Sequence, residues 1–336
     1  MLNDPAAVTE QLMAVDSTSG NEGRAIAWLE RVLGGAGWLT TRIPVTEGRD
    51  DLYARSTSGP CAVTLSTHID TVPPFIPPRR DHHRLYGRGA CDAKGIAASM
   101  IVAAERLRVR GVAVGLLFVV GEEVSHDGAH AANSWVHANP TGSRVIINGE
   151  PTESTLALGT KGAVRVVVRT KGQAAHSAYP HLGRSATSDL AKMLAELDAL
   201  ELPTDELLGN TTINIGSLAG GVADNVVAPS AEARLMIRLV TPADHVRAIL
   251  TEWANGRASL EWGAMVPPMR LGVIEGFPTS VAAFATDIPE LTNWGTPFLF
   301  GPGSIHVAHR GDEFIEIAEL SSAVETYERL VERLTG

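Results

Sequence analysis

The chain has 336 residues, of which 44% are hydrophobic and 20% charged, an ordinary globular composition that suffices for one large core or two smaller ones. Its net charge of −10 argues against nucleic-acid binding, which needs a broad basic surface. The longest apolar run, residues 112–120, is far shorter than the roughly 20 residues of a membrane-spanning helix. With no signal-peptide pattern and only two cysteines, we expect a cytoplasmic protein without a membrane partner.

Helices and strands are predicted to alternate through the first half of the chain. Asp4 and Pro5 have the N-cap and first-turn preferences that start a short helix, and a second helical pattern covers about 22–35. Further along, the predicted elements are a strand at 61–67, a helix at 93–110, a strand at 112–120, a helix at 128–138 and a strand at 144–148. This alternation favours an α/β fold, in which helices cover both faces of a mostly parallel sheet.

The order of elements changes in the second half. Strands are predicted at 163–170, 211–218, 231–240 and 258–262, with helices at 185–200 and 242–255. The resulting order, βαββαβ, is that of a small ferredoxin-like α+β domain. From about residue 270 the first pattern returns and ends in a helix near 317–334. We therefore predict an α/β domain formed by residues 1–162 and 268–336, with residues 163–267 inserted into it.

Polar side chains follow three predicted strands, at the end of the sheet where open α/β folds bind ligands. His68 and Asp70 come after the first of these strands, which suits a metal ligand with a carboxylate nearby to orient it. Glu122 and Glu123 follow the next strand, and Glu150 follows a third. Two adjacent carboxylates repel each other unless they share a cation or a proton. Taken singly, each group also fits a loop histidine or a solvated pair of acids.

Asp92 lies in the glycine-rich segment G-R-G-A-C-D-A-K-G, which leads into a predicted helix. A dinucleotide-binding loop is an alternative interpretation, but the G-x-G-x-x-G spacing is missing and no strand directly precedes it. Near the end of the chain, I-H-V-A-H supplies His306 and His309. Two imidazoles, one aspartate and two glutamates form an N/O ligand set for a pair of divalent ions. Cys91 is expected to be a small packed residue.

Six short motifs in this order resemble the M20 family of metallohydrolases, which includes acetylornithine deacetylase, succinyl-diaminopimelate desuccinylase and glutamate carboxypeptidase. They are S-T-H-I-D-T-V-P at 66–73, Y-G-R-G-A-C-D-A-K-G at 86–95, G-E-E at 121–123, G-E-P-T at 149–152, K-G-Q-A-A-H-S-A at 171–178 and G-P-G-S…A-H-R-G-D-E-F at 301–314. They extend over nearly the whole chain, and the inserted βαββαβ domain also resembles the family pattern. Each motif alone is weak, but six in order are specific.

The resemblance implies a role for each polar residue at the strand ends. One metal would be held by His68 and Glu150, the other by Glu123 and His309, and the Asp92 carboxylate would bridge them. The peptide bond between Asp92 and Ala93 would be cis. Asp70 would orient His68, and Glu122 would be the general base. The expected cofactors are two divalent ions, zinc first, with cobalt or manganese as alternatives. The motif order favours His309 over His306 as the ligand, and the other histidines near the glutamates, His126, His130 and His137, are expected on a helix as surface or packing residues.

Three residues of the inserted domain match family positions that contact substrate. His176 would stabilise the oxyanion, and in dimeric family members this histidine comes from the partner subunit. Asn225 and Arg238 would grip the substrate carboxylate, which arginine can hold with two parallel hydrogen bonds. An ordinary surface charge is the alternative for Arg238. The resemblance also implies a homodimer formed through the inserted domain.

The sequence therefore predicts a dinuclear metal-dependent amidohydrolase that removes the acyl group from a small N-acyl amino acid. Acetylornithine or acetyl-lysine deacetylation, in arginine or lysine biosynthesis, is the first expectation. Succinyl-diaminopimelate or succinyl-ornithine cleavage comes next, followed by dipeptidase or carboxypeptidase action. An inactive relative that binds metal as a scaffold is the remaining alternative, which loss of a ligand or of Glu122 would mark; all are present.

Overall fold

The computed structural model describes residues 2–335. The first helix, α1 (Pro5–Met13), starts as predicted, because the Asp4 side chain accepts a hydrogen bond from the Ala6 backbone N–H at 3.0 Å. The other helices of the first half are α2 (Gly23–Gly35), α3 (Lys94–Val109) and α4 (Asp127–Ala138). The final helix is α7 (Ile317–Thr335). All five lie within a few residues of their predicted positions.

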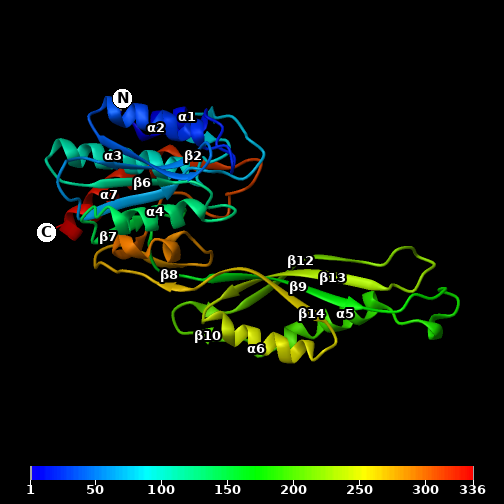
Figure 1. The fold of residues 1–336 in the computed structure, drawn as a ribbon. Coiled ribbons are helices and arrows are strands. Elements are labelled where there is room, and N and C mark those ends of the chain that lie inside the picture. Colours follow the sequence, from blue (N-terminus) through cyan, green and yellow to red (C-terminus); the bar gives the residue numbers. More distant parts are fainter. Residues whose placement is uncertain (1, 336) are drawn as a thin grey trace. The chain divides into compact units, whose positions relative to one another are not determined.

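A six-stranded sheet forms the centre of the first part of the chain, with the strand order β1-β2-β6-β3-β7-β17 (Figure 1). Its strands are β1 (Leu39–Thr46), β2 (Arg49–Arg55), β3 (Val63–His68), β6 (Gly115–Val119), β7 (Val145–Asn148) and β17 (Thr296–Leu299). Strands β6, β3, β7 and β17 are parallel to one another, whereas β2 pairs antiparallel with both β6 and the edge strand β1. The prediction of a mostly parallel α/β sheet is confirmed, and the carboxyl ends of β3, β6 and β7 meet at one edge.

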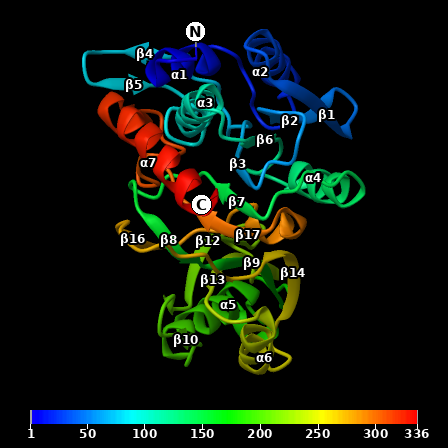
Figure 2. The ribbon, with the colours of Figure 1, turned by 90° about the vertical axis from the view of Figure 1, so that its left-hand side faces the viewer.

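Helices cover both faces of this sheet (Figure 2). Successive residues of β6 point to opposite faces, as the pleat requires. Leu116 and Phe118 join the core beneath α1, α2, α3 and α7, whereas Leu117 and Val119 join the core beneath α4. Helix α3 is buried along almost its whole length, because it packs between the sheet and the helices α1 and α7. Its position places the glycine-rich segment before it at the carboxyl ends of the strands.

The second part of the chain has the predicted order βαββαβ. Its elements are β9 (Gly162–Lys171), α5 (Ala186–Ala195), β12 (Thr212–Gly220), β13 (Ser230–Leu239), α6 (Ala243–Ala254) and β14 (Ser259–Val266). The strands form an antiparallel sheet in the order β12-β13-β9-β14, and α5 and α6 pack on one face of it around a separate core. An inserted ferredoxin-like domain is therefore confirmed, although α5 ends at Ala195, earlier than expected.

The chain divides into two compact units. The first unit is Met1–Leu158, Leu271–Ser280 and Thr286–Gly336, and the inserted unit is Gly159–Arg270 and Val281–Ala285; the sequence suggested 163–267 for the insertion. The shorter elements are β4 (Arg79–Arg80), β5 (Arg84–Tyr86), β8 (Leu156–Thr160), β10 (Thr204–Asp205), β11 (Gly209–Asn210), β15 (Met269–Arg270), β16 (Thr279–Ala282), β18 (Phe314–Glu316), η1 (Pro180–Leu182), η2 (Leu197–Ala199), η3 (Ile288–Glu290) and η4 (Thr292–Trp294). Among residues 2–335, no helix combines the length and the apolar character needed to cross a membrane.

Candidate metal centre

His68 is the last residue of β3, where the central strand of the parallel sheet ends. Its side chain is buried, and its Nε2 atom lies 3.1 Å from an Asp92 carboxylate oxygen and 4.0 Å from a Glu150 oxygen. Glu150 follows β7, the neighbouring strand, so parallel pairing brings the two side chains to one edge. His68, Asp92 and Glu150 thus form a first cluster of metal-ligand atoms, all within 4.8 Å of one another.

Asp92 also belongs to a second cluster, with Glu123 and His309. The Nε2 atom of His309 lies 3.1 Å from the second oxygen of Asp92 and 3.0 Å from Glu123 Oε1. The five residues predicted as ligands therefore lie together, and Asp92 is shared by both clusters. His306 belongs to neither, because its side chain is largely exposed and its nearest carboxylate is Glu153, at 3.9 Å.

A buried ion pair supports the turn that carries Asp92. Glu313 accepts hydrogen bonds from the backbone N–H groups of Cys91 and Asp92, at 3.2 and 3.3 Å. Its other oxygen accepts from Arg88 Nη1 at 2.7 Å. The peptide bond between Asp92 and Ala93 is cis, as the family resemblance implied. Sequence reasoning placed Glu313 only within a motif and missed its contact with Arg88, which lies over 200 residues away along the chain.

Asp70 holds the loop that carries both glutamates, as well as the ring of His68. The His68 Nδ1 atom is 3.0 Å from the Asp70 backbone oxygen and 3.5 Å from its carboxylate. The carboxylate accepts hydrogen bonds from the backbone N–H groups of Glu122 and Glu123, at 3.0 and 3.2 Å, and from Ser19. Asp70 therefore contacts four residues around the centre, whereas the sequence suggested a contact with His68 alone.

The pKa shifts at the centre show that its carboxylates interact strongly with positive groups and with one another. Burial raises the pKa of Asp92, but hydrogen bonds with His309 and His68 outweigh it and hold that pKa below its usual value. Hydrogen bonds with Asp92 and Glu123 raise the pKa of His309 to about 10. Burial, together with nearby carboxylates, raises the pKa of Glu150 well above its usual range. A pair of divalent cations suits this donor set, because imidazole nitrogens and carboxylate oxygens bind zinc and similar ions.

Glu122 lies beside these clusters without belonging to either. Its ligand atom instead lies within 4.8 Å of atoms of His126 and Asp287. His126 was expected on a helix as a surface or packing residue, but it is the N-cap of α4 with a left-handed backbone (φ 55°), and its Nδ1 is 2.7 Å from Asp287 Oδ1. No motif pointed to Asp287, since it is a single acid in a loop far from Glu122 along the chain. His130 is exposed, as expected.

The inserted unit holds the three predicted substrate contacts at two separate places. His176 and Asn225 are neighbours, because the Ser177 N–H donates to the Asn225 backbone oxygen at 2.9 Å. Arg238 lies near the other end of β13, opposite Ala163 of β9. The seven residue steps from Ala231 to Arg238 span roughly 23 Å of extended strand. Within one chain Asn225 and Arg238 therefore lie towards opposite ends of β13, and the expectation that both grip one carboxylate stays a prediction.

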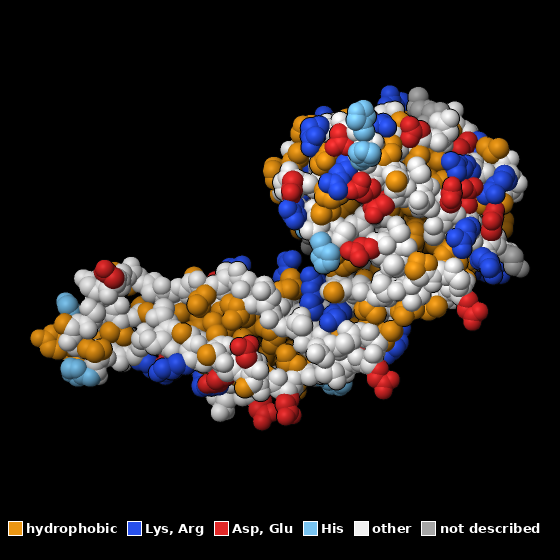
Figure 3. All heavy atoms as spheres, turned by 180° about the vertical axis from the view of Figure 1, so that it is seen from behind, with side chains coloured by type: hydrophobic (Ala, Val, Ile, Leu, Met, Phe, Trp, Pro, Cys, Tyr) orange, Lys and Arg blue, Asp and Glu red, His pale blue; other side chains and the backbone are white. Residues whose placement is uncertain are grey.

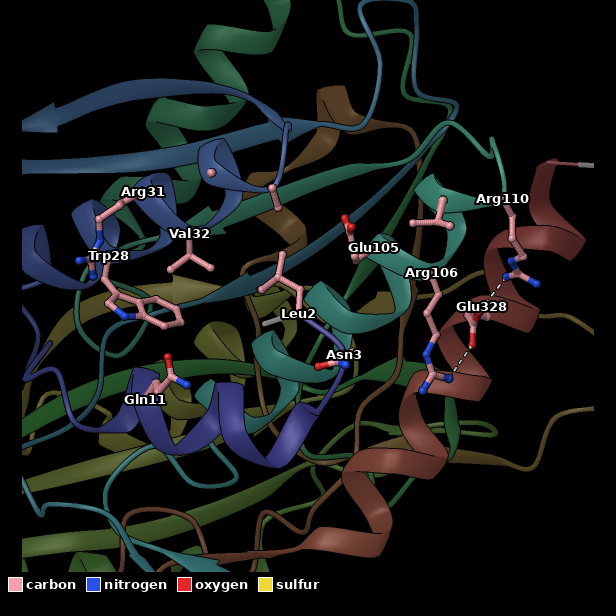
Figure 4. A pocket seen from close by; sticks show the side chains of 13 residues that line it. Leu2, Asn3, Gln11, Trp28, Arg31, Val32, Glu105, Arg106, Arg110 and Glu328 are labelled. Carbon is pink, nitrogen blue, oxygen red and sulfur yellow. Dashed lines mark hydrogen bonds and ion pairs between the residues drawn. The ribbon is translucent and has the colours of Figure 1, made fainter.

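A cleft of about 1080 Å³ lies elsewhere on the first unit, among α1, α2, α3 and α7. Figure 4 shows Trp28 and Val32 on its wall, and Glu328 paired with Arg106 and Arg110 at 3.3 and 2.8 Å. None of the five ligand residues lines it. The cleft is larger than the other described pockets, but its lining offers no group of side chains that could bind a metal ion.

Comparison with known proteins identifies the class to which this fold and cluster belong. Residues 158–258 match the family model described as "Peptidase dimerisation domain". A protein of Aspergillus terreus named "Probable carboxypeptidase" is 37% identical over 96% of this chain and 84% of its own length. The chain therefore belongs to the M20 family of metal-dependent hydrolases that act on amide bonds.

Solved structures share this fold. A tripeptidase from Staphylococcus aureus superposes with a TM-score of 0.80 at 19% identity, covering 98% of this chain and 97% of its own. An M20 family metallo-carboxypeptidase from Sulfolobus solfataricus superposes with a TM-score of 0.77 at 17% identity, covering 99% of both chains. At such identities the likeness speaks for the fold, an α/β domain that carries an inserted domain.

Proposed function

We propose that the protein hydrolyses the amide bond between a small acyl group and the amino group of an amino acid whose carboxylate is free. The observation that carries this proposal is the convergence of five ligand residues on two clusters that share Asp92, with Glu122 beside them. His68, Asp92, Glu123, Glu150 and His309 would hold two divalent ions. We expect zinc, and cobalt or manganese fit the same donor set.

When bound, the ions supply Lewis-acid polarisation of the amide oxygen and a lower pKa for the attacking water. Glu122 is the general base, taking a proton from that water and giving it to the leaving amine. Its backbone N–H is anchored to Asp70, while its side chain lies outside both ligand clusters and stays free for proton transfer. His176 donates a hydrogen bond to the oxyanion, an interaction worth about 10²–10³ in rate.

The substrate carboxylate is held by Arg238, a half-buried side chain on the outward face of β13. Burial and the nearby Arg165 guanidinium lower the pKa of Arg238, so an anion between them would relieve their repulsion. We further propose that a homodimer forms through the inserted unit, and that His176 and Asn225 serve the site of the partner subunit. Two findings support this: the match to a dimerisation domain, and the separation of Asn225 from Arg238 within one chain. Figure 3 shows apolar side chains gathered on the surface of the inserted unit. Tyr179 and Leu218 are among the exposed large apolar residues of this unit.

The nature of the acyl group distinguishes two forms of this proposal. The motifs favour an acetyl group on ornithine or lysine, with succinyl substrates next. The name of the Aspergillus terreus relative instead favours an aminoacyl or peptidyl group, which would make the enzyme a carboxypeptidase or dipeptidase. Both forms use the same clusters and the same carboxylate contact, so they differ only in the acyl group that is removed. Assays with different substrates therefore decide between them.

A substrate panel tests the proposal. Metal-loaded protein is assayed with N-acetylornithine, N-succinyl-diaminopimelate and dipeptides, each beside its carboxamide analogue. We expect turnover of at least one carboxylate substrate and a large loss with the analogue. Arg238→Ala should raise KM for the carboxylate substrate only, whereas Arg234→Ala, an exposed arginine of the same strand, should change little. Equal losses by Arg238→Ala on both substrates would reject the carboxylate contact, and no turnover at all would reject the proposed function.

A further inference from the structure

A third group of possible metal ligands lies in the first unit, next to the two clusters already described. Glu122, His126 and Asp287 each offer one ligand atom, and these atoms are all within 4.8 Å of one another. The geometry resembles that of the two other clusters, in which one imidazole faces two carboxylates. Glu122 and His126 come from the loop before α4, and Asp287 comes from the residue that precedes η3.

Both outer residues of this group are held in place by the fold. Asp287 is 1% exposed and caps η3, where the Glu290 backbone N–H donates to its backbone oxygen at 2.9 Å. His126 has a left-handed backbone, and its backbone N–H donates to the Gly121 oxygen at 2.8 Å. This turn points the imidazole back toward Asp287, with the two side chains 2.7 Å apart. A pre-formed donor pair of this kind loses little conformational freedom when an ion binds.

Negative charge exceeds positive charge around the group. Asp51 is fully buried nearby, and its Oδ2 atom has no hydrogen-bond partner among residues 2–335. Burial raises the pKa of Asp51, and the Asp287 carboxylate adds to this, so the two acids interact. The Asp127 carboxylate acts on Asp51 as well, and the cations that offset these acids are His126 beside Asp287, Arg49 near Asp51 and His68 near Glu122. Unpaired buried carboxylates are costly unless a cation or a proton compensates them.

We propose that Glu122, His126 and Asp287 form a third divalent-cation site, which takes zinc or an ion of similar ligand preference. Imidazole nitrogen and carboxylate oxygen are both zinc donors, and three protein ligands is the number found in zinc sites that leave a position open to solvent. An ion at this site inhibits the enzyme, because it occupies the carboxylate of Glu122, which must accept the proton. This effect rests on the proposed role of Glu122 as general base. Excess metal then competes with catalysis, while the first two ions are required for it.

Metal binding is measured directly, apart from activity. Full-length protein is stripped with a chelator and titrated with Zn²⁺ by calorimetry, and bound metal is counted after desalting. We expect three equivalents per chain for the wild type, with the third the weakest, and two for His126→Gln and for Asp287→Asn. His130→Gln is the matched control, since His130 is an exposed histidine of α4 that pairs with Glu290 instead, at 3.2 Å; it should bind three.

Inhibition by excess zinc gives the second readout. The zinc concentration that halves wild-type turnover should rise at least tenfold in His126→Gln and Asp287→Asn, and stay unchanged in His130→Gln. The site would be overturned if the wild type bound only two metal equivalents, or if a third equivalent still bound to both variants. His126 and Asp287 would then form an ion pair and nothing more. Three equivalents without inhibition would support the site and overturn the assignment of Glu122 as the base. Total inactivity at every metal concentration, with three ions bound, would instead count against the proposed reaction.

Discussion

Glu122 and Glu123 are consecutive residues, yet their side chains have different surroundings. Both backbone N–H groups donate to the Asp70 carboxylate, which fixes the loop. From that anchor Glu123 reaches His309 at 3.0 Å, whereas Glu122 lies outside both clusters that share Asp92. Burial, with nearby carboxylates, raises the pKa of Glu122 well above its usual range. Two carboxylates in such different surroundings suit two different tasks.

Glutamine substitutions should separate these tasks, because glutamine keeps the shape of the side chain but can neither accept a proton nor bind a cation as strongly. We expect Glu122→Gln to keep two metal equivalents and to lose about 10²–10⁴ in kcat, the usual contribution of a general base. Glu123→Gln should lose activity together with one metal equivalent. Metal analysis and steady-state kinetics on the same preparations provide the test. Near-normal turnover by Glu122→Gln would show that another group takes the proton.

The sequence predicted those site residues that directly follow strands or lie in a family motif. His68, Glu123 and Glu150 each stand at the end of a strand, so the sheet itself brings them together. His126 and Asp287 could not be paired in advance, because their contact depends on how a loop 161 residues away folds against α4. A single acid or histidine in a loop has no periodicity or spacing that would reveal its partner.

At the scale of elements, the buried strands and amphipathic helices were predictable from apolar runs, whereas the sheet edge was not. Strands β1 and β2 were not assigned, because β1 is mostly exposed and alternates little. Strand β2 is instead held by polar contacts at one end. Arg49 of β2 donates hydrogen bonds to Glu22, which precedes α2, and to Asp127, the first residue of α4. One side chain thus joins three elements.

Removal of Arg49 should destabilise the first unit, because Glu22 is fully buried and would lose its positive partner. We expect Arg49→Met to lower the free energy of unfolding by about 3 kcal/mol. Arg42→Met is the matched control, since Arg42 pairs with the exposed Glu30 and should cost less than about 1 kcal/mol. Chemical denaturation of the three proteins measures both values. Equal effects would mean that burial of the pair does not matter.

The destabilisation caused by Arg49→Met should depend on pH, and the pKa of Asp127 gives the direction. Burial raises the pKa of Asp127, but the hydrogen bond and charge of Arg49, together with hydrogen bonds from Ser125 and the Gly128 backbone, lower it further, so the pKa is lowered in the folded state. The stability that this provides is present above the unfolded pKa, near 4, and is lost as pH falls through the folded value. The difference between wild type and Arg49→Met should therefore narrow below about pH 4. If the difference in free energy of unfolding stayed constant below about pH 4, the Arg49–Asp127 ion pair would not be its source.

At the scale of the whole molecule, the fold class and the insertion were predictable, but the separation of Asn225 from Arg238 within the inserted unit was not. The motifs gave Asn225 and Arg238 one shared task, whereas the β12–β13 hairpin holds them at opposite ends. Sequence motifs indicate which residues a family uses, but they do not say how far apart one chain holds them. That separation follows from the length of the extended strands between them.

The two units have separate cores, and all five predicted ligands lie in the first. Metal binding should therefore stabilise that unit selectively. An ion at about 100 times its dissociation constant adds roughly 2.7 kcal/mol, which slows hydrogen exchange through unfolding of the unit that binds it by up to about 100-fold. In hydrogen-exchange mass spectrometry, peptides that cover β3, β6 and β7 should gain protection on addition of zinc, and those of β9 and β13 should not. Equal protection of both units would mean that they unfold together. Protection of the inserted unit alone would place the ions outside the cluster around Asp92.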